Sequence, residues 1–281
     1  MKEKKPTLIV IYLLMLALAI YILFPIAWIL LMSFKTEQDV IAVPPKIIFT
    51  PTLNNYLALF GFGQVGLVSG ETFVQGFKNS FILSAASVFT SLFFALPAAY
   101  ALARLRFKAK DSLAFTFLSY RFLPAITIIL PLYVVYQKIG LAYTYLGLIL
   151  VYQLISIPLM IWMMRSYFEE IPIAVERAAR TDGYSWLGSF VRVVLPLAAP
   201  GLAATVILCF IFCWNNFIFG MILGGVRTQP LTVGLLSFMG TNEVQWGLMA
   251  AATIIAILPE LVLAVAVQKY IIRGLTFGTV K

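Results

Sequence analysis

The sequence predicts an all-α protein that crosses a membrane with about six helices, and three observations predict this fold class. Hydrophobic residues make up 62% of the chain and charged residues only 11%, whereas roughly a quarter of the residues of a soluble domain are charged. The apolar residues form repeated runs of about 20 residues, each long enough to cross a hydrocarbon core ~30 Å thick as a helix. These runs are continuously apolar, unlike the alternating ~10-residue strands of a membrane barrel. We therefore expect one transmembrane domain over residues 1–281.

Six segments have the length and apolarity of a membrane helix. They are Leu8–Met32, Phe77–Ala103, Ser112–Gln137, Tyr145–Arg165, Ala198–Leu223 and Trp246–Tyr270. Prolines fall in or near most of them, and we expect kinks there because neighbouring helices can satisfy the freed carbonyls. The first segment follows three lysines, as a signal peptide does, but it is too long for the apolar region of one. An uncleaved first span is expected.

The positions of the basic residues predict the orientation of the chain. With the amino terminus inside, 14 of the 20 lysines and arginines face the cytoplasm and five face outwards. This bias places both termini in the cytoplasm, with an outer loop at about 36–76, a cytoplasmic loop at about 166–197 and a cytoplasmic tail at 271–281. The net charge of +9 is thus explained by topology and does not indicate nucleic-acid binding.

The cytoplasmic loop contains the most informative stretch, Glu176 to Pro196, which is polar and charged although it lies between apolar spans. Within the loop, Glu169–Arg180 has the composition of a helix. Gly183 is expected to end that helix in a left-handed conformation, and Tyr184–Val194 can form a second helix. The sequence predicts a helix-turn-helix projection from the membrane. In a membrane protein, such a polar projection indicates a binding site for a partner in the aqueous phase.

The same loop resembles the EAA signature of permease subunits of binding-protein-dependent ATP-binding-cassette (ABC) importers. The shared order is two alanines, an aspartate and a glycine, then nine residues and Val193-Val194-Leu195-Pro196. The resemblance implies a type I ABC importer permease fold, whose short coupling helix sits in a cleft of the ATPase subunit. The implied ATPase-coupling residues are Glu176, Arg177, Ala178, Ala179, Asp182 and Gly183.

The chain departs from this signature at one position. Aligning the alanines puts Arg177 where the motif has glutamate, with Glu176 one residue earlier. Because the substitution reverses the charge offered to the ATPase, the salt bridge of the family is not carried over to Arg177. Whether Glu176 takes the place of the motif glutamate is left open by the sequence.

The resemblance extends over nearly the whole chain and points to the shorter permease of the maltose-type sugar importers. It rests on Asn79-Ser80, the run Ala98–Phe107, the run Tyr120–Pro124, Trp214-Asn215-Asn216-Phe217 and the ending Arg273–Lys281. The resemblance implies a second homologous permease, two ATPase subunits that bind ATP and Mg, and an extracytoplasmic sugar-binding protein, in the cytoplasmic membrane of a bacterium or archaeon. It implies no cofactor in this chain.

Two other transport functions remain as alternatives. One is an ABC importer permease for another solute, such as amino acids or peptides. The other is an ion-coupled secondary transporter, which is expected to show inverted repeats and coupling acids at mid-membrane; Glu260 is the acid that fits that position.

Catalysis within this chain is not expected. The sequence has no GxxxxGK[ST] loop to hold nucleotide phosphates, and it has no histidine, the usual general base near neutral pH. Cys209 and Cys213 lie one helical turn apart in an apolar span. A pair of small buried side chains explains them better than a redox or metal site.

Five polar or aromatic residues within the spans are candidates for the translocation pathway or its gate: Arg121, Trp214, Asn215, Asn216 and Glu260. A charge at a helix centre costs ~2.5 to 3.5 kcal/mol, so Arg121 requires a partner or water. Counting ~1.5 Å per residue puts Arg121 and Glu260 at similar depths, so we expect them to pair or to line one polar cavity. A static pair that fixes packing is an equal alternative. For the asparagines, hydrogen bonds to sugar and hydrogen bonds between helices are weighted equally.

Overall fold

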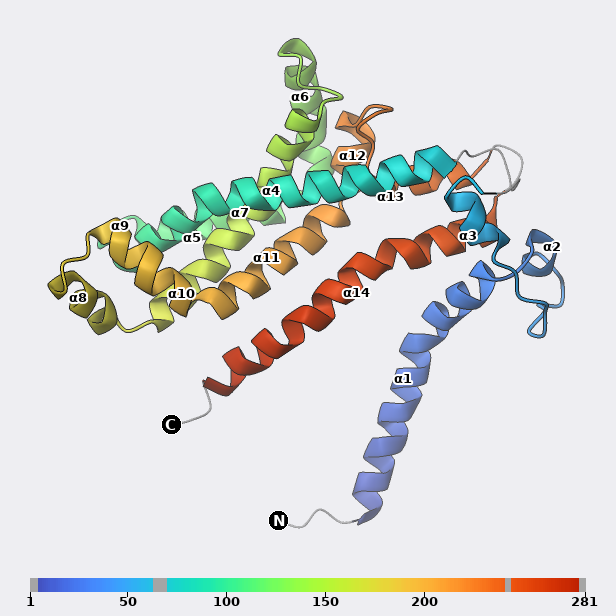
Figure 1. The fold of residues 1–281 in the computed structure, drawn as a ribbon, viewed down its shortest axis with the longest axis horizontal. Coiled ribbons are helices and arrows are strands. Elements are labelled where there is room, and N and C mark those ends of the chain that lie inside the picture. Colours follow the sequence, from blue (N-terminus) through green and yellow to red (C-terminus); the bar gives the residue numbers. More distant parts are fainter. Residues whose placement is uncertain (1–4, 63–69, 241–243, 278–281) are drawn as a thin grey trace. The chain divides into compact units, whose positions relative to one another are not determined.

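The computed structural model describes residues 5–62, 70–240 and 244–277, and the regular elements of this part are helices (Figure 1). They are α1 (Lys5–Ser33), α2 (Glu37–Val40), α3 (Asn54–Leu59), α4 (Gly70–Arg104), α5 (Lys110–Ser119), the 3-10 turn η1 (Tyr120–Phe122), α6 (Ala125–Lys138), α7 (Tyr145–Glu170), α8 (Ile173–Thr181), α9 (Trp186–Ser189), the π-helical turn η2 (Phe190–Val194), α10 (Leu195–Leu197), α11 (Ala199–Trp214), α12 (Ile218–Leu223), α13 (Leu231–Gly234), the 3-10 turn η3 (Leu235–Phe238) and α14 (Trp246–Phe277). The predicted all-α class is confirmed.

Four of the six predicted spans are single helices that are long and apolar enough to cross a membrane. They are Leu8–Ser33, Glu71–Arg104, Tyr145–Glu170 and Trp246–Gln268. The third predicted span corresponds to a pair of helices bent by 91°. Within the fifth, Ala199–Trp214 forms a second bent pair, at 78°, with Trp186–Leu197, which precedes the predicted span. The total reaches six if each bent pair counts as one span.

The third span is broken, so the prediction of one helix over Ser112–Gln137 is wrong. The break follows η1, where Leu123 takes an extended conformation and Pro124 becomes the N-cap of α6. Proline has no N–H to donate, and it disfavours the α conformation of the residue before it. The 91° bend between α5–η1 and α6 therefore has a local chemical cause (Figure 1).

The fifth span is also interrupted, and one helix over Ala198–Leu223 is likewise wrong. At its far end, α11 stops at Trp214, and two amide side chains bind backbone groups on either side of the break. Asn215 donates from Nδ2 to the carbonyl of Ile211 at 3.1 Å, and Asn216 Oδ1 accepts from the N–H of Phe219 at 3.2 Å, which starts α12. At its near end, the chain bends by 78° at Ala198, between Trp186–Leu197 and α11.

Two expected loops are shorter in the structure. Helix α4 begins at Gly70, so it takes in the last residues of the outer loop expected at 36–76. Helix α14 continues to Phe277, so residues 271–277 of the expected tail are helical. The rest of that tail, 278–281, lies outside the described residues.

The chain forms two compact units, 1–74 with 235–258 (unit 1) and 75–234 with 259–281 (unit 2). In unit 1, the segment after α1 is held by a buried lysine. Lys35 donates from Nζ to the carbonyl of Lys46 at 2.6 Å and lies 4.9 Å and 5.0 Å from the ring centroids of Trp28 and Phe49. The Glu37 carboxylate accepts from the first two N–H groups of α14, where a helix favours a negative charge.

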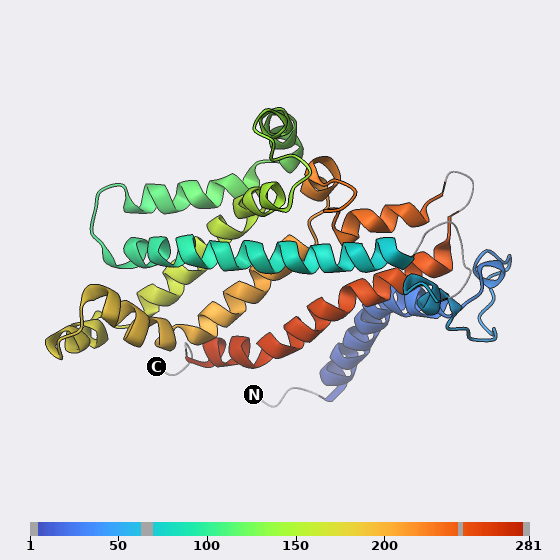
Figure 2. The same cartoon turned by 45° about the horizontal axis from the view of Figure 1, so that its top comes forward.

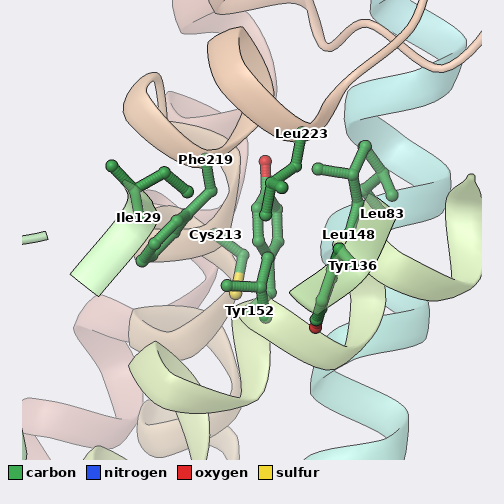
Figure 3. Packing of buried hydrophobic residues seen from close by; sticks show 9 residues of the cluster. Leu83, Ile129, Tyr136, Leu148, Tyr152, Cys213, Phe219 and Leu223 are labelled. Atoms are coloured by element: carbon green, nitrogen blue, oxygen red, sulfur yellow. The ribbon is translucent and has the colours of Figure 1, made fainter. Parts of the chain in front are cut away.

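The core of unit 2 surrounds Tyr152 on α7, which is packed among aliphatic and aromatic side chains of α4, α6, α7, α11 and α12 (Figure 3). Helix α11 contributes a row of small buried residues, one per turn, namely Gly201, Thr205, Cys209 and Cys213. Small residues let membrane helices approach closely. Both cysteines are free and buried, in agreement with a packing role.

Candidate functional site

Helices α8 and α9 form a hairpin at the end of unit 2 where α7 ends and α11 begins (Figures 1 and 2). Helix α8 begins at Ile173, because α7 continues to Glu170 and the chain is extended at Ile171. The helix predicted over Glu169–Arg180 is therefore present from Ile173 onwards, and its predicted start is four residues too early. The turn after α8 has the predicted left-handed glycine, Gly183, with φ of +93°.

The second arm of the hairpin differs from the single helix predicted over Tyr184–Val194. The Ser185 hydroxyl caps α9 by accepting from the N–H of Gly188 at 3.0 Å. Helix α9 then passes into the π-helical turn η2, which leads through α10 to the bend at Ala198.

A buried ion pair attaches α8 to the end of α4. The Glu176 carboxylate accepts hydrogen bonds from Arg104 Nε and, at 2.8 Å, from the hydroxyl of Tyr100. Arg104 also donates from Nη2 to the carbonyl of Ile171 at 2.9 Å. The side chains of Arg104 and Glu176 are only 5% and 6% exposed. These contacts fix the start of α8 to the last turn of α4.

Three aromatic rings lie beneath this pair. The Tyr100 ring centroid is 4.5 Å from that of Phe190 and 5.8 Å from that of Phe168, and Phe168 and Phe190 are 5.8 Å apart. The rings come from α4, α7 and η2. The base of the hairpin is therefore an apolar cluster shared by three segments, with one ion pair on top of it.

The six predicted coupling residues separate into two groups. Arg177, Ala178, Asp182 and Gly183 are exposed, whereas Glu176 and Ala179 are buried against the chain itself. The sequence predicted a coupling role for Glu176 at the contact with the ATPase, but the structure directs its carboxylate inwards to Arg104. Glu176 is thus an anchor of the hairpin and does not offer its charge to a partner.

The hairpin also exposes a basic and apolar surface that the sequence analysis did not single out. The guanidinium of Arg180 lies 4.3 Å from the ring centroid of Trp186, and that of Arg192 lies 5.8 Å from the ring of Tyr184. Leu187, at the tip of α9, is 70% exposed. A groove of about 500 Å³ runs beside these residues, lined by Gly183, Tyr184, Ser185, Leu187, Gly188, Val191 and Arg192.

Of the two arrangements expected for Arg121 and Glu260, an ion pair or a shared polar cavity, the structure does not contain the ion pair. Among the described residues, neither takes part in an ion pair. The Arg121 guanidinium lies 4.5 Å from the ring centroid of Phe212, and Glu260 Oε1 accepts from Asn215 Nδ2 at 2.8 Å. Depth counted along a helix gives the distance of a residue from the membrane surface, but it does not give the helix face or the neighbours of the side chain.

The other three pathway candidates differ in their exposure and contacts. Trp214 is 2% exposed and packs on Phe210 and Phe77, with centroids 5.7 Å and 5.3 Å away. Asn216 Oδ1 accepts from the N–H of Phe219 in the first turn of α12, and its carbonyl accepts from Thr232 Oγ1 at 2.9 Å. Both residues therefore hold the structure together. Asn215, in contrast, is exposed.

The loop 224–230 is held by a polar side chain, Asn79, for which no structural role was predicted. Asn79 on α4 donates from Nδ2 to the carbonyls of Arg227 and Gln229 at 3.0 Å and 2.8 Å. Its Oδ1 accepts from the Tyr145 hydroxyl at 2.6 Å. The adjacent Ser80 accepts from the N–H of Leu231 at 2.8 Å. An asparagine followed by a serine within an apolar helix was the available signal.

Comparison with known proteins gives consistent results. Residues 91–277 match the family described as binding-protein-dependent transport system inner membrane component. The chain is 32% identical over 268 residues to the trehalose/maltose transport system permease protein MalG of Thermococcus litoralis, covering 94% of this chain and 93% of the relative. It is 34% identical over 269 residues to the trehalose transport system permease protein SugB of Mycobacterium tuberculosis, covering 93% of each.

Among solved structures, the fold is similar to a chain of a bacterial ABC transporter involved in the import of the acidic polysaccharide alginate. The TM-score is 0.77 at 25% identity, and the match covers 96% of this chain and 98% of the other. Both the family match and the identities extend over most of the sequence. The chain therefore belongs to the family of inner membrane components of binding-protein-dependent transport systems.

Proposed function

We propose that the chain is the permease subunit of an ATP-driven, binding-protein-dependent sugar importer and that it forms half of the translocation pathway. The relatives that carry trehalose or maltose in their names support the solute class. The observation that carries the coupling role is the α8–α9 hairpin, which exposes four of the six predicted coupling residues above a buried ion pair.

The proposed assembly contains a second homologous permease, two ATPase subunits that bind ATP and Mg, and an extracytoplasmic sugar-binding protein. The family description, which names binding-protein dependence, supports the last of these. In the proposed orientation both termini and the hairpin lie in the cytoplasm, because 14 of the 20 basic residues then face inwards. ATP hydrolysis belongs to the ATPase subunits, and this chain converts their motion into transport.

The hairpin is connected directly to the membrane helices α4, α7 and α11. Closure of the ATPase subunits around α8 displaces it, and the buried Arg104–Glu176 pair passes that displacement to α4. Helix α7 continues into α8 through two residues, and α10 leads into α11. Rigid helices attached at these points turn together, as in other domain motions.

For the pathway we propose the hydrogen-bonded pair Asn215 and Glu260. Asn215 is exposed and Glu260 half-buried, so a solute in the pathway reaches their polar atoms. Replacing Glu260 by glutamine keeps an acceptor for Asn215 and removes the charge. We expect uptake to fall about tenfold or more, since hydrogen bonds to charged groups contribute roughly 1.5 to 3 kcal/mol, while assembly is unchanged.

Measured sugar uptake in proteoliposomes, with complex yield as a separate readout, tests this prediction. The matched control is Glu169→Gln, which removes a carboxylate paired with Arg165 at the end of α7. Uptake by the Glu260 variant equal to that by the control would contradict a pathway role.

The proposed function is tested by isolating the chain with its partners in lipid nanodiscs and measuring ATP hydrolysis with the binding protein and a panel of mono- and disaccharides. We expect one or a few sugars to stimulate hydrolysis severalfold. Stimulation by amino acids or peptides alone would refute the sugar assignment. Transport driven by an ion gradient without any ATPase would refute the importer, and Glu260 would then be the residue to test for ion coupling.

A further inference from the structure

The charge that the hairpin presents to a partner is basic. Residues 173–194 contain two carboxylates and three arginines. One carboxylate, Glu176, is buried against Arg104, so its charge is compensated within the chain. Asp182 is the other, and it is exposed together with Arg177, Arg180 and Arg192. A partner therefore meets three arginines and one aspartate.

Two of these arginines are held in defined positions. Arg180 lies over Trp186 at 4.3 Å and Arg192 lies near Tyr184 at 5.8 Å from its ring centroid. Contact with an aromatic face orients a guanidinium and leaves its N–H groups free to bind a carboxylate in a bidentate manner. Because less side-chain freedom remains to be lost, such arginines are well prepared to bind discrete carboxylates.

The surface between the arginines is apolar. Leu187 is 70% exposed, and Trp186 is half exposed beside the groove that runs from Gly183 to Arg192. Ala178 keeps the outer face of α8 flat. An apolar centre with charged groups around it is the usual composition of a protein interface.

We propose that the ATPase cleft that receives α8 carries carboxylates at its rim, opposite Arg177 and Arg180, around an apolar centre. The inference rests on the proposed function and names the chemistry of the partner at that same site. In the family motif the position of Arg177 is a glutamate, so this chain and its ATPase have exchanged the signs of one contact. Glu176 does not restore the motif charge, because Arg104 and Tyr100 take up its carboxylate.

The direction in which Arg177→Glu changes the affinity for the ATPase decides between an acidic and a basic cleft. In nanodiscs of neutral lipid, the binding of the purified ATPase subunit is measured for the wild-type chain, Arg177→Gln and Arg177→Glu. An acidic rim predicts weaker binding for the glutamine variant and at least about tenfold weaker binding for the glutamate variant at low salt. The difference shrinks at 1 M salt, where the screening length is ~3 Å.

The control is Arg227→Glu, an exposed arginine on the loop 224–230 outside the hairpin, and it is expected to leave the affinity unchanged. Equal or tighter ATPase binding by the Arg177→Glu variant would show a basic cleft and overturn the inference alone. An effect seen only in nanodiscs of anionic lipid would assign the arginines to lipid headgroups and would also overturn it. A wild-type chain that binds no ATPase would overturn the proposed function itself.

Discussion

Replacing Arg104 by methionine is expected to loosen the α8–α9 hairpin and to uncouple ATP hydrolysis from transport. The substitution leaves the Glu176 carboxylate buried with the Tyr100 hydroxyl as its remaining side-chain donor. Removing one partner of a buried ion pair costs about 3–5 kcal/mol, because the other charge stays uncompensated. Hydrogen exchange over residues 173–194 should become faster, and binding-protein-stimulated hydrolysis should no longer drive uptake.

A double-mutant cycle separates the ion pair from general damage to the fold. We expect Glu176→Met to be harmful as well, and the variant with both methionines to be more stable than either single variant, since two apolar side chains of similar volume can replace a buried pair. The control is Arg165→Met, which breaks pairs with Asp111 and Glu169, whose side chains are 83% and 42% exposed. Because water reaches both carboxylates, losing their partner costs less than it does for the buried Glu176. Equal effects of the Arg104 and Arg165 variants would contradict an anchoring role.

Comparing Arg104 variants with Arg177 variants separates anchoring of the hairpin from binding of a partner. Arg177 variants should change the affinity for the ATPase and leave hydrogen exchange over the hairpin as it is, because the Arg177 side chain is exposed. Arg104 variants should change the exchange first. Transport activity alone would not separate the two roles, because a neutral substitution at Arg104 or at Arg177 is expected to lower it.

The position of the hairpin was predictable from the sequence, but the orientation of Glu176 was not. A polar segment with a glycine at a helix end is a local signal, and the structure places Gly183 at the expected left-handed turn. The helical period puts Glu176 and Ala179 on one face and Arg177 on another. Which face is buried depends on Arg104, which lies 72 residues earlier. A contact of that separation is set by tertiary packing and has no local signal.

The helix breaks illustrate the same limit. Pro97, Pro131 and Pro158 all lie inside continuous helices, whereas Pro124 starts a new one. Each proline removes one backbone hydrogen bond, but the outcome depends on whether neighbouring groups satisfy the freed carbonyl. A proline in an apolar run therefore does not tell by itself whether the span is one helix or two, and four predicted spans are single helices whereas the third is broken.

Replacing Gly201 by leucine is expected to separate α11 from α7 and to prevent assembly. A Cβ at this position would lie closer than 3.0 Å to three ring carbons of Tyr167 on α7, a separation that real side chains do not adopt. Even alanine should be destabilising, because excess volume in a packed core costs typically about 1–3 kcal/mol. Melting temperature and yield of the complex in nanodiscs measure the effect.

Two variants make the interpretation of this result specific. Gly234→Ala is the control, since a Cβ there has no atom within 4 Å and alanine is the better helix former. Truncating Tyr167 to alanine should partly rescue Gly201→Ala by making room for the new methyl group. A Gly201→Ala chain as stable as wild type would show that the Tyr167 ring moves aside freely. If Tyr167→Ala rescues Gly201→Ala, the contact between Gly201 and the Tyr167 ring sets the distance between α7 and α11. These two helices flank the hairpin, so the same contact also positions the surface that we propose binds the ATPase.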